Sequence, residues 1–114
     1  MEENILASIK EAIGNEAEYT HFDKPIIMAI NSAFAILHQL GVGPKLKPFA
    51  IVDGSETWDE FMTVNDTELV KNYIAIKVQK MFDPPTNSFL MTALNEMEKE
   101  YEWRLNVDAE NGVI

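Results

Sequence analysis

Two adjacent prolines, Pro84 and Pro85, separate two helical patterns and constrain the fold more than any other feature of the chain. Proline cannot donate a backbone hydrogen bond, and it forces the residue before it out of the helical conformation. Asp83 must therefore leave the preceding helix, whereas prolines are tolerated in the first turn of the helix that follows. The sequence predicts two helices that fold back on each other at a stiff corner formed by Asp83, Pro84 and Pro85.

Apolar residues recur at helical spacing on both sides of this corner. Before it, the pattern predicts a helix over residues 66–82, which a capping sequence at residues 65–68 starts. After it, apolar residues advance by four, three, four and four positions, which predicts a long helix over 86–106. This stripe consists of Leu90, Leu94, Met97, Tyr101 and Leu105. Residues 107–114 lose the periodicity, and we expect them to form a mobile acidic tail.

The N-terminal half of the chain predicts two further helices, over residues 3–13 and 24–40, and each pattern ends next to a glycine. Phe34 lies on the apolar face of the second helix, and we expect it in the core. Four apolar stripes need mutual burial, because loops cannot cover all of them. The sequence therefore predicts an all-α fold, a small antiparallel bundle of about four helices that forms one domain over residues 1–106.

Residues 42–64 are the least regular part of the chain. Within them, residues 49–52 followed by Asp53 and a glycine predict a short strand that enters a tight turn. Residues 57–60 match the capping box, in which Thr and Glu side chains bond backbone N–H groups, and predict a short helix over 58–62. The segment also contains several large apolar side chains, so we expect a structured excursion that docks on the bundle. Loops that a rigid scaffold holds in place frequently carry function.

No motif in the sequence indicates catalysis or metal binding. The chain has no cysteine, and His21 and His38 lack metal-ligand spacing to each other. Glutamates at every second position of 96–102 scatter around a helix, so we expect a solvated face in place of an acid–base pair. We expect no enzymatic activity and no cofactor.

The net charge of −10 is distributed unevenly. Residues 1–23 and 53–68 each carry six acidic side chains, whereas residues 24–52 carry three lysines and no acid. Such a negative field repels phosphates, so we expect DNA to pass nearby without specific binding. Acidity also commonly keeps a small protein soluble. We expect no membrane partner, because no apolar run approaches the ~20 residues that span a bilayer.

Opposite charges and large aromatic side chains mark candidate interaction residues. Two basic edges, two acids, two tryptophans and one arginine form this set. They are Lys45, Lys47, Asp53, Trp58, Asp59, Lys77, Lys80, Trp103 and Arg104. Aromatic side chains are enriched at interface centres but are as readily core residues. We expect Tyr101 in the core, and for Trp103 both packing under a loop and contact with another subunit remain open.

Several strings occur in a particular order and spacing: Ile26–Phe34, Gln39–Pro44, Trp58–Phe61, Tyr73–Ile74 with Lys77–Val78, Phe82–Pro85 and Glu102–Asn106. This pattern, which covers nearly the whole chain, resembles the small head-completion or head-to-tail connector proteins of tailed bacteriophages and prophages. The resemblance implies a helical fold, no catalysis and a place in the virion after synthesis in the bacterial cytoplasm. It also implies a ring of identical subunits beneath the portal, through which the genome leaves the capsid.

The partners implied by this resemblance are further copies of the chain, the portal protein and a downstream head-completion or tail protein. A closed ring needs two different, complementary patches on each subunit. The acidic segment 53–68 and the basic edges at Lys45/Lys47 or Lys77/Lys80 are candidates for these patches. Two alternatives remain: an acidic, phage-encoded inhibitor that mimics DNA, and a small helical adaptor unrelated to virions.

Overall fold

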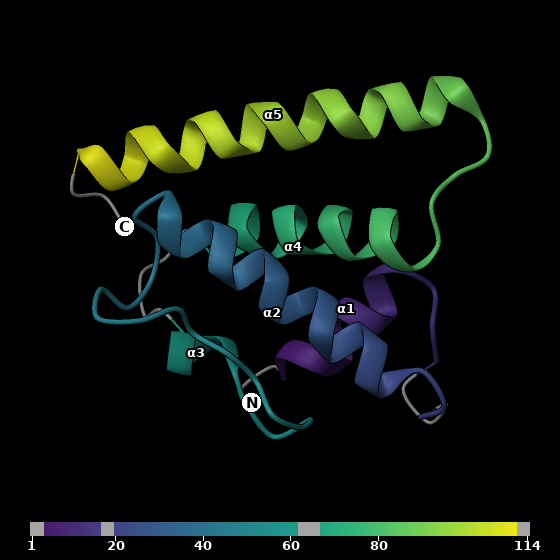
Figure 1. Cartoon of the computed structure of the whole chain (residues 1–114), viewed down its shortest axis with the longest axis horizontal. Helices are drawn as coiled ribbons and strands as arrows, with labels where there is room; N and C mark the ends of the chain where they lie inside the picture. Colours follow the sequence, from purple (N-terminus) through teal and green to yellow (C-terminus); the bar gives the residue numbers. More distant parts are fainter. Residues whose placement is uncertain (1–3, 17–19, 62–66, 112–114) are drawn as a thin grey trace.

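The computed structural model of the protein describes residues 4–16, 20–61 and 67–111. Its helices are α1 (Ile5–Ala12), α2 (Asp23–Gln39), α3 (Trp58–Phe61), α4 (Thr67–Phe82) and α5 (Ser88–Glu110). The described ranges contain no strand, only an isolated antiparallel bridge between Asn4 and Thr57, so the predicted all-α fold is confirmed. In Figure 1, α4 lies between α5 and the layer formed by α1 and α2, and α5 runs antiparallel to α4.

Glycines end the first two long segments, as their positions predicted. Gly14 and Gly41 follow α1 and α2 with φ angles of 81° and 89°, which are readily adopted only by glycine. After α2, the N–H of Gly41 donates to His38 O at 3.0 Å and the N–H of Val42 donates to Leu37 O at 2.9 Å. This pair of bonds is the Schellman motif, which satisfies the last carbonyls of a helix and reverses the chain.

The core forms around α4, which is buried on more than one face because helices pack on both sides of it. Its buried side chains include Val70, Tyr73, Ile74, Ile76 and Val78. From α2, the facing side chains are Ile26, Ala29, Ile30, Ala33, Phe34 and Leu37. The α1 helix adds Ile5, Leu6 and Ile9. The predicted apolar stripes of these three helices therefore meet in one cluster.

The excursion docks on the bundle, but the strand predicted at residues 49–52 does not form. The amide side chain of Asn31 in α2 takes the place of a strand partner: its Nδ2 donates to Ile51 O at 3.0 Å, and Ile51 N–H donates to its Oδ1 at 2.8 Å. Aromatic rings anchor the same segment, with Phe49 and Phe61 centred 5.1 and 4.8 Å from the ring of Phe34. The segment is extended because it lies on a helix, not because it joins a sheet.

The short helix predicted near Trp58 is confirmed as α3, whereas its predicted capping box is wrong. Thr57 Oγ1 is buried and makes no hydrogen bond among the described residues. The first turn is closed by the backbone instead, with Glu60 N–H donating to Thr57 O at 3.1 Å. Ile5 N–H bonds Glu56 O at 3.0 Å, and this pairing with the start of α1 turns the Thr57 side chain inward. Residues 62–64 of the excursion lie outside the described residues.

The proline corner differs from its prediction in one respect. Asp83 leaves α4 and both prolines precede the last helix as expected, but α5 begins at Ser88 and not at residue 86. Asn87 is the physical reason, because its Oδ1 accepts the N–H groups of Phe89 at 2.8 Å and Leu90 at 3.3 Å. Asparagine is among the best N-cap residues, so the helix starts after it.

The last helix is also longer than predicted at its C-terminal end. It continues to Glu110, so residues 107–110, which the sequence assigned to the acidic tail, are helical. Contacts with the end of α2 extend the helix: Asn106 Nδ2 donates to Leu40 O at 3.2 Å. A Cβ added to Gly41 would lie only 3.3 Å from Ala109 Cβ, which shows how closely the two helix ends approach. Residues 112–114 lie outside the described part of the chain.

We expect Phe34→Ala to lower the free energy of unfolding by ~3–5 kcal/mol, because the side chain is 1% exposed and its removal leaves a cavity between aromatic rings. Urea denaturation followed by circular dichroism measures this loss. Phe89→Ala is the matched control at 86% exposure and should change stability by less than ~0.5 kcal/mol. A loss below about 1 kcal/mol for Phe34→Ala would contradict the aromatic core described above.

Candidate functional site

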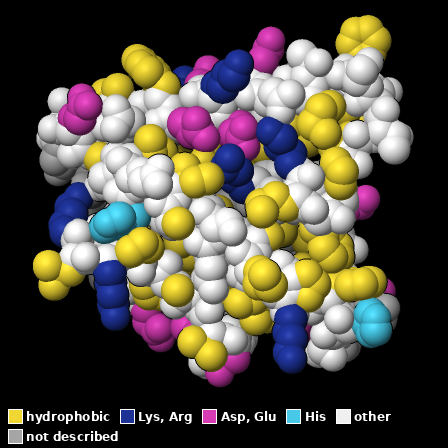
Figure 2. Space-filling view, in the orientation of Figure 1, with side chains coloured by type: hydrophobic (Ala, Val, Ile, Leu, Met, Phe, Trp, Pro, Cys, Tyr) yellow, Lys and Arg dark blue, Asp and Glu magenta, His cyan; other side chains and the backbone are white. Residues whose placement is uncertain are grey.

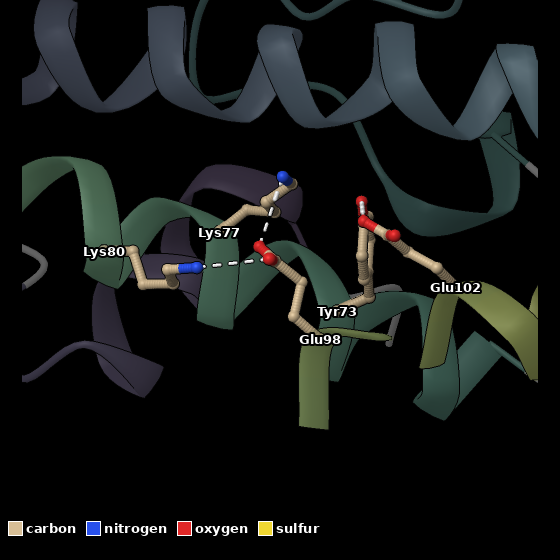
Figure 3. A network of polar contacts seen from close by, with 5 residues as sticks. All are labelled: Tyr73, Lys77, Lys80, Glu98 and Glu102. Atoms are coloured by element: carbon tan, nitrogen blue, oxygen red, sulfur yellow. Dashed lines mark hydrogen bonds and ion pairs between the residues drawn. The ribbon is translucent and has the colours of Figure 1, made fainter. Parts of the chain in front are cut away.

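Polar side-chain contacts connect α5 to α4. Leu105 is the one fully buried side chain among the described residues of α5. Near the middle of the helix, the carboxylate of Glu98 lies between Lys77 and Lys80 of α4, with Nζ to oxygen distances of 3.1 Å to each lysine (Figure 3). The predicted basic edge at Lys77 and Lys80 is therefore half-buried, and both lysines pair with a carboxylate of the same molecule.

The same contact explains the ionisation of Glu98. Burial disfavours the charged carboxylate, but the hydrogen bonds and positive charges of Lys80 and Lys77 outweigh burial and hold the pKa of Glu98 below its usual value. One turn further along α5, Glu102 Oε2 accepts a hydrogen bond from the hydroxyl of Tyr73, with an oxygen to oxygen distance of 2.7 Å. Burial, followed by this bond to a carboxylate, strongly raises the pKa of Tyr73, so its hydroxyl remains a neutral donor.

The solvated glutamate face predicted for α5 is only half correct. Glu98 and Glu102 are four positions apart, lie on one side of the helix and bond α4, as Figure 3 shows. Glu96 and Glu100, two positions away from them, are exposed as expected. An alternating row of charges on a helix thus contributes one inward pair and one outward pair.

The two tryptophans have different environments. Trp58 is 4% exposed, and its indole N–H donates to Ser8 Oγ at 2.8 Å, so this candidate interface residue belongs to the core. Trp103 is 67% exposed on the outer side of α5, so the alternative of packing under a loop is wrong. Tyr101 is half-buried against the core cluster. Arg104 lies beside Trp103 in the sequence and is also exposed.

A proline-bounded loop after α2, which we call the tip, comprises residues 44–48. Leu46 at its centre is fully exposed, and the lysines on both sides of it, Lys45 and Lys47, are exposed as well. Lys45 Nζ donates to Gly41 O at 2.6 Å, which ties the loop to the end of α2. The tip is therefore the part of the predicted basic surface that remains available to a partner.

The acidic candidates lie in the excursion and on α3. Asp53 is exposed, and its carboxylate accepts the hydroxyl of Ser55 at 2.6 Å and the N–H of Ser55 at 2.8 Å. These two bonds lower the pKa of Asp53. Asp59 in α3 is exposed too, whereas Asp66 lies outside the described part. The acidic segment thus presents ionised side chains to solvent.

Exposed apolar side chains flank the connection between α4 and α5, a feature that the sequence analysis missed. Met81, Phe89 and Leu90 are 58%, 86% and 58% exposed. Leu90 was predicted to be buried with the α5 stripe. The sequence contains one signal of this exposure, since Phe89, Leu90 and Met91 are consecutive and cannot all face α4. We call Met81, Asp83, Phe89 and Leu90 the corner patch.

A shallow apolar hollow of about 250 Å³ lies between the start of α2 and the end of α4. Its lining residues are Pro25, Met28, Ala29, Ser32, Met81 and Phe82. In Figure 2, hydrophobic side chains gather over this side of the molecule, where α2 begins and the chain passes from α4 to α5. Methionine side chains are adaptable, and they are over-represented at surfaces that accept partners.

Neither metal binding nor membrane insertion finds support in the described ranges. No group of histidine, aspartate or glutamate side chains there has the arrangement of a metal site. Within the same ranges, no helix has both the length and the apolar character to cross a bilayer. His38 instead helps to position the tip, with Nδ1 3.2 Å from Pro44 O.

We expect Glu98→Gln to reduce the free energy of unfolding at pH 7 by ~1–3 kcal/mol, because two half-buried lysines lose their counter-charge. The pKa of Glu98 is lower in the folded protein than in the unfolded chain. Its ionised form therefore stabilises the fold above about pH 4.3, and this contribution disappears as the pH falls through the folded-state pKa.

Urea denaturation of the parent protein and of the Glu98→Gln variant between pH 7 and pH 3 measures this effect. The difference between their free energies of unfolding should shrink as the pH falls. Glu96→Gln, an exposed change on the same helix, is the matched control and should behave like the parent protein. Equal stability of the Glu98→Gln and Glu96→Gln variants at pH 7 would contradict a structural role for the Glu98 contacts.

Comparison with known protein families matches residues 5–112 to the phage connector proteins. The match begins with α1 and extends beyond the end of α5, so it covers every helix in the described ranges. Comparisons with curated proteins and with solved structures give no match. The resemblance read from the order and spacing of the sequence strings is therefore confirmed at the level of the family. This acidic helical bundle, with polar contacts between its last two helices and exposed apolar residues near their connection, belongs to the phage connector protein family.

Proposed function

We propose that this protein is a structural subunit of the virion, assembled as a ring that binds the portal and joins the filled head to the tail. The observation that carries the proposal is the number of large apolar side chains left exposed outside a closed core. They are Phe22, Met28, Leu46, Val52, Met81, Phe89, Leu90, Met97 and Trp103. Large exposed apolar areas mark sites of contact with other proteins. Family membership supports the same role, since connector proteins are components of the virion.

The charge distribution fits a subunit that surrounds DNA without holding it. The net charge is −10, and Lys77 and Lys80 turn toward Glu98 instead of facing outward. Phosphate binding depends mainly on exposed Lys and Arg side chains, so the remaining surface repels the genome. A repulsive lumen lets a packaged genome pass when it is released.

The function proposed here is binding and not catalysis. The half-buried polar groups of α4 and α5 bond one another: Tyr73 with Glu102, and the two lysines with Glu98. Such pairing stabilises the helix pair and engages these groups with one another instead of with a substrate. The same pairing disfavours the acidic-inhibitor alternative, because Glu98 and Glu102 turn inward and do not extend an outward array of carboxylates.

The decisive test uses virions made without this protein. We expect particles that lose DNA or fail to join tails, seen by electron microscopy and by measurement of nuclease-resistant DNA, because the portal lacks its adaptor. Supplying the intact protein in trans should restore filled, tailed particles. Filled, stable and tailed particles in its absence would contradict the adaptor role and favour the inhibitor alternative.

We also expect Trp103→Ala to weaken attachment to purified portal rings at least ~10-fold while leaving the fold intact, because an exposed tryptophan is a typical interface anchor. Sedimentation of the two proteins together measures attachment, and circular dichroism checks the fold. Glu96→Gln, exposed on the same helix, is the control and should bind as the parent protein does. Unchanged attachment of the Trp103→Ala variant would exclude Trp103 from the portal contact.

A further inference from the structure

The tip presents an exposed apolar side chain that a partner surface could bury. Leu46 is 100% exposed, although burying a leucine side chain stabilises a protein by roughly 1.5–3 kcal/mol. Prolines on both sides restrict the loop, and His38 and Lys45 tie it to the end of α2. Lys45 and Lys47 are the only charged side chains between Gly41 and Val52, so the loop presents one apolar group between two positive charges.

The corner patch has the complementary composition. Its apolar side chains, Met81, Phe89 and Leu90, are more than half exposed, and Asp83 between them is exposed as well. Residues 81–98 contain acidic side chains but no lysine or arginine. The nearest preceding cations on α4, Lys77 and Lys80, are only partly exposed and both pair with Glu98. The patch therefore offers an apolar surface that contains one exposed carboxylate, Asp83.

These two surfaces lie at opposite ends of one molecule. The tip follows the C-terminal end of α2, and the corner patch flanks the connection at the other end of the long axis, which extends 37 Å (Figure 1). One copy cannot bring its own tip to its own corner patch without unfolding. Two different patches at opposite ends produce a head-to-tail contact, which is the type of contact that closes into a ring.

The acidic segment is a poorer partner for the tip, although its charge is suitable. The α3 helix, which carries Asp59 and Glu60, lies on the same side of the molecule as the tip (Figure 1). Its apolar side chains, Trp58 and Phe61, are buried and offer no surface to Leu46. A contact with α3 would satisfy the lysines of the tip but leave its leucine in water.

From these observations we infer that the tip of one subunit docks on the corner patch of the next copy, with Leu46 against Phe89 and Leu90 and Lys47 facing Asp83. This inference rests on the proposed ring but goes beyond it, because it assigns the residues that join neighbouring subunits. The contact involves few side chains, and it is small beside the ~800 Å² per partner of a standard interface. Isolated subunits therefore associate weakly, and closure on the portal adds the remaining contacts.

The absence of cysteine from the chain allows a direct test by cross-linking. Equimolar Leu46→Cys and Phe89→Cys proteins are mixed at a concentration on the order of 1 mM, suited to a weak contact, and oxidised. We expect the mixed disulfide between positions 46 and 89 to exceed, several-fold, its share under random pairing. Mass spectrometry of the linked peptides identifies each product. Both positions are exposed, so neither change disturbs the core.

A mixture of Leu46→Cys with Glu60→Cys is the matched comparison, since Glu60 is exposed on the rival acidic surface. It should give only random pairing. Random pairing of 46 with 89, or preferential pairing of 46 with 60, would overturn the inference. If rings still form on the portal in that case, the adaptor role stands and a different contact joins the subunits.

A charge exchange tests the polar half of the contact. Lys47→Glu in the Leu46→Cys protein should lower the yield of the 46 to 89 product several-fold at low salt, because its new charge faces Asp83. Asp83→Lys in the Phe89→Cys protein should restore the yield. Failure of this rescue, with both proteins folded by circular dichroism, would exclude the pairing of Lys47 with Asp83. If the cross-link forms but virions do not need the protein, the contact stands and the adaptor role fails.

Discussion

The burial of α4 between α5 and the α1–α2 layer is the constraint on which the rest of the structure depends. A helix covered on several sides must bury its apolar side chains and also satisfy its polar ones, because an unpaired polar group in the interior is costly. Tyr73, Lys77 and Lys80 of α4 point toward α5, and they find partners in Glu102 and Glu98. The register between the last two helices follows from these partners.

This arrangement leaves the first turns of α5 without a covering layer. N-terminal to Glu98, the α5 side chains Phe89, Leu90 and Met97 remain partly or largely exposed. The Asn87 cap and the rigid residues of the corner hold this end in place without burying it. The exposed end of α5 is the surface on which we propose that a neighbouring subunit docks.

Local rules predicted the helices well but did not predict how their surfaces are used. Gly14 and Gly41 end helices because only glycine readily adopts their positive φ angles, and this requirement is visible in the sequence. Asn31, by contrast, gave no local sign that its amide would bond the backbone of Ile51, twenty residues away. The predicted strand at residues 49–52 is wrong for this reason. The prediction that residues 42–64 dock on the bundle could be made because the large aromatic side chains of this segment require burial.

The sequence and the tertiary structure also determined different features of the candidate site. Composition and spacing alone determined an acidic, cysteine-free helical bundle with a fixed corner before its last helix, because helical periodicity, proline and glycine act over a few residues. Only the tertiary structure decided that Trp58 is core while Trp103 is exposed, and that Lys77 and Lys80 face Glu98 while Lys45 and Lys47 face water. Exposure and charge pairing depend on which helix lies opposite a side chain, and that neighbour is set by the packing of the whole chain around α4.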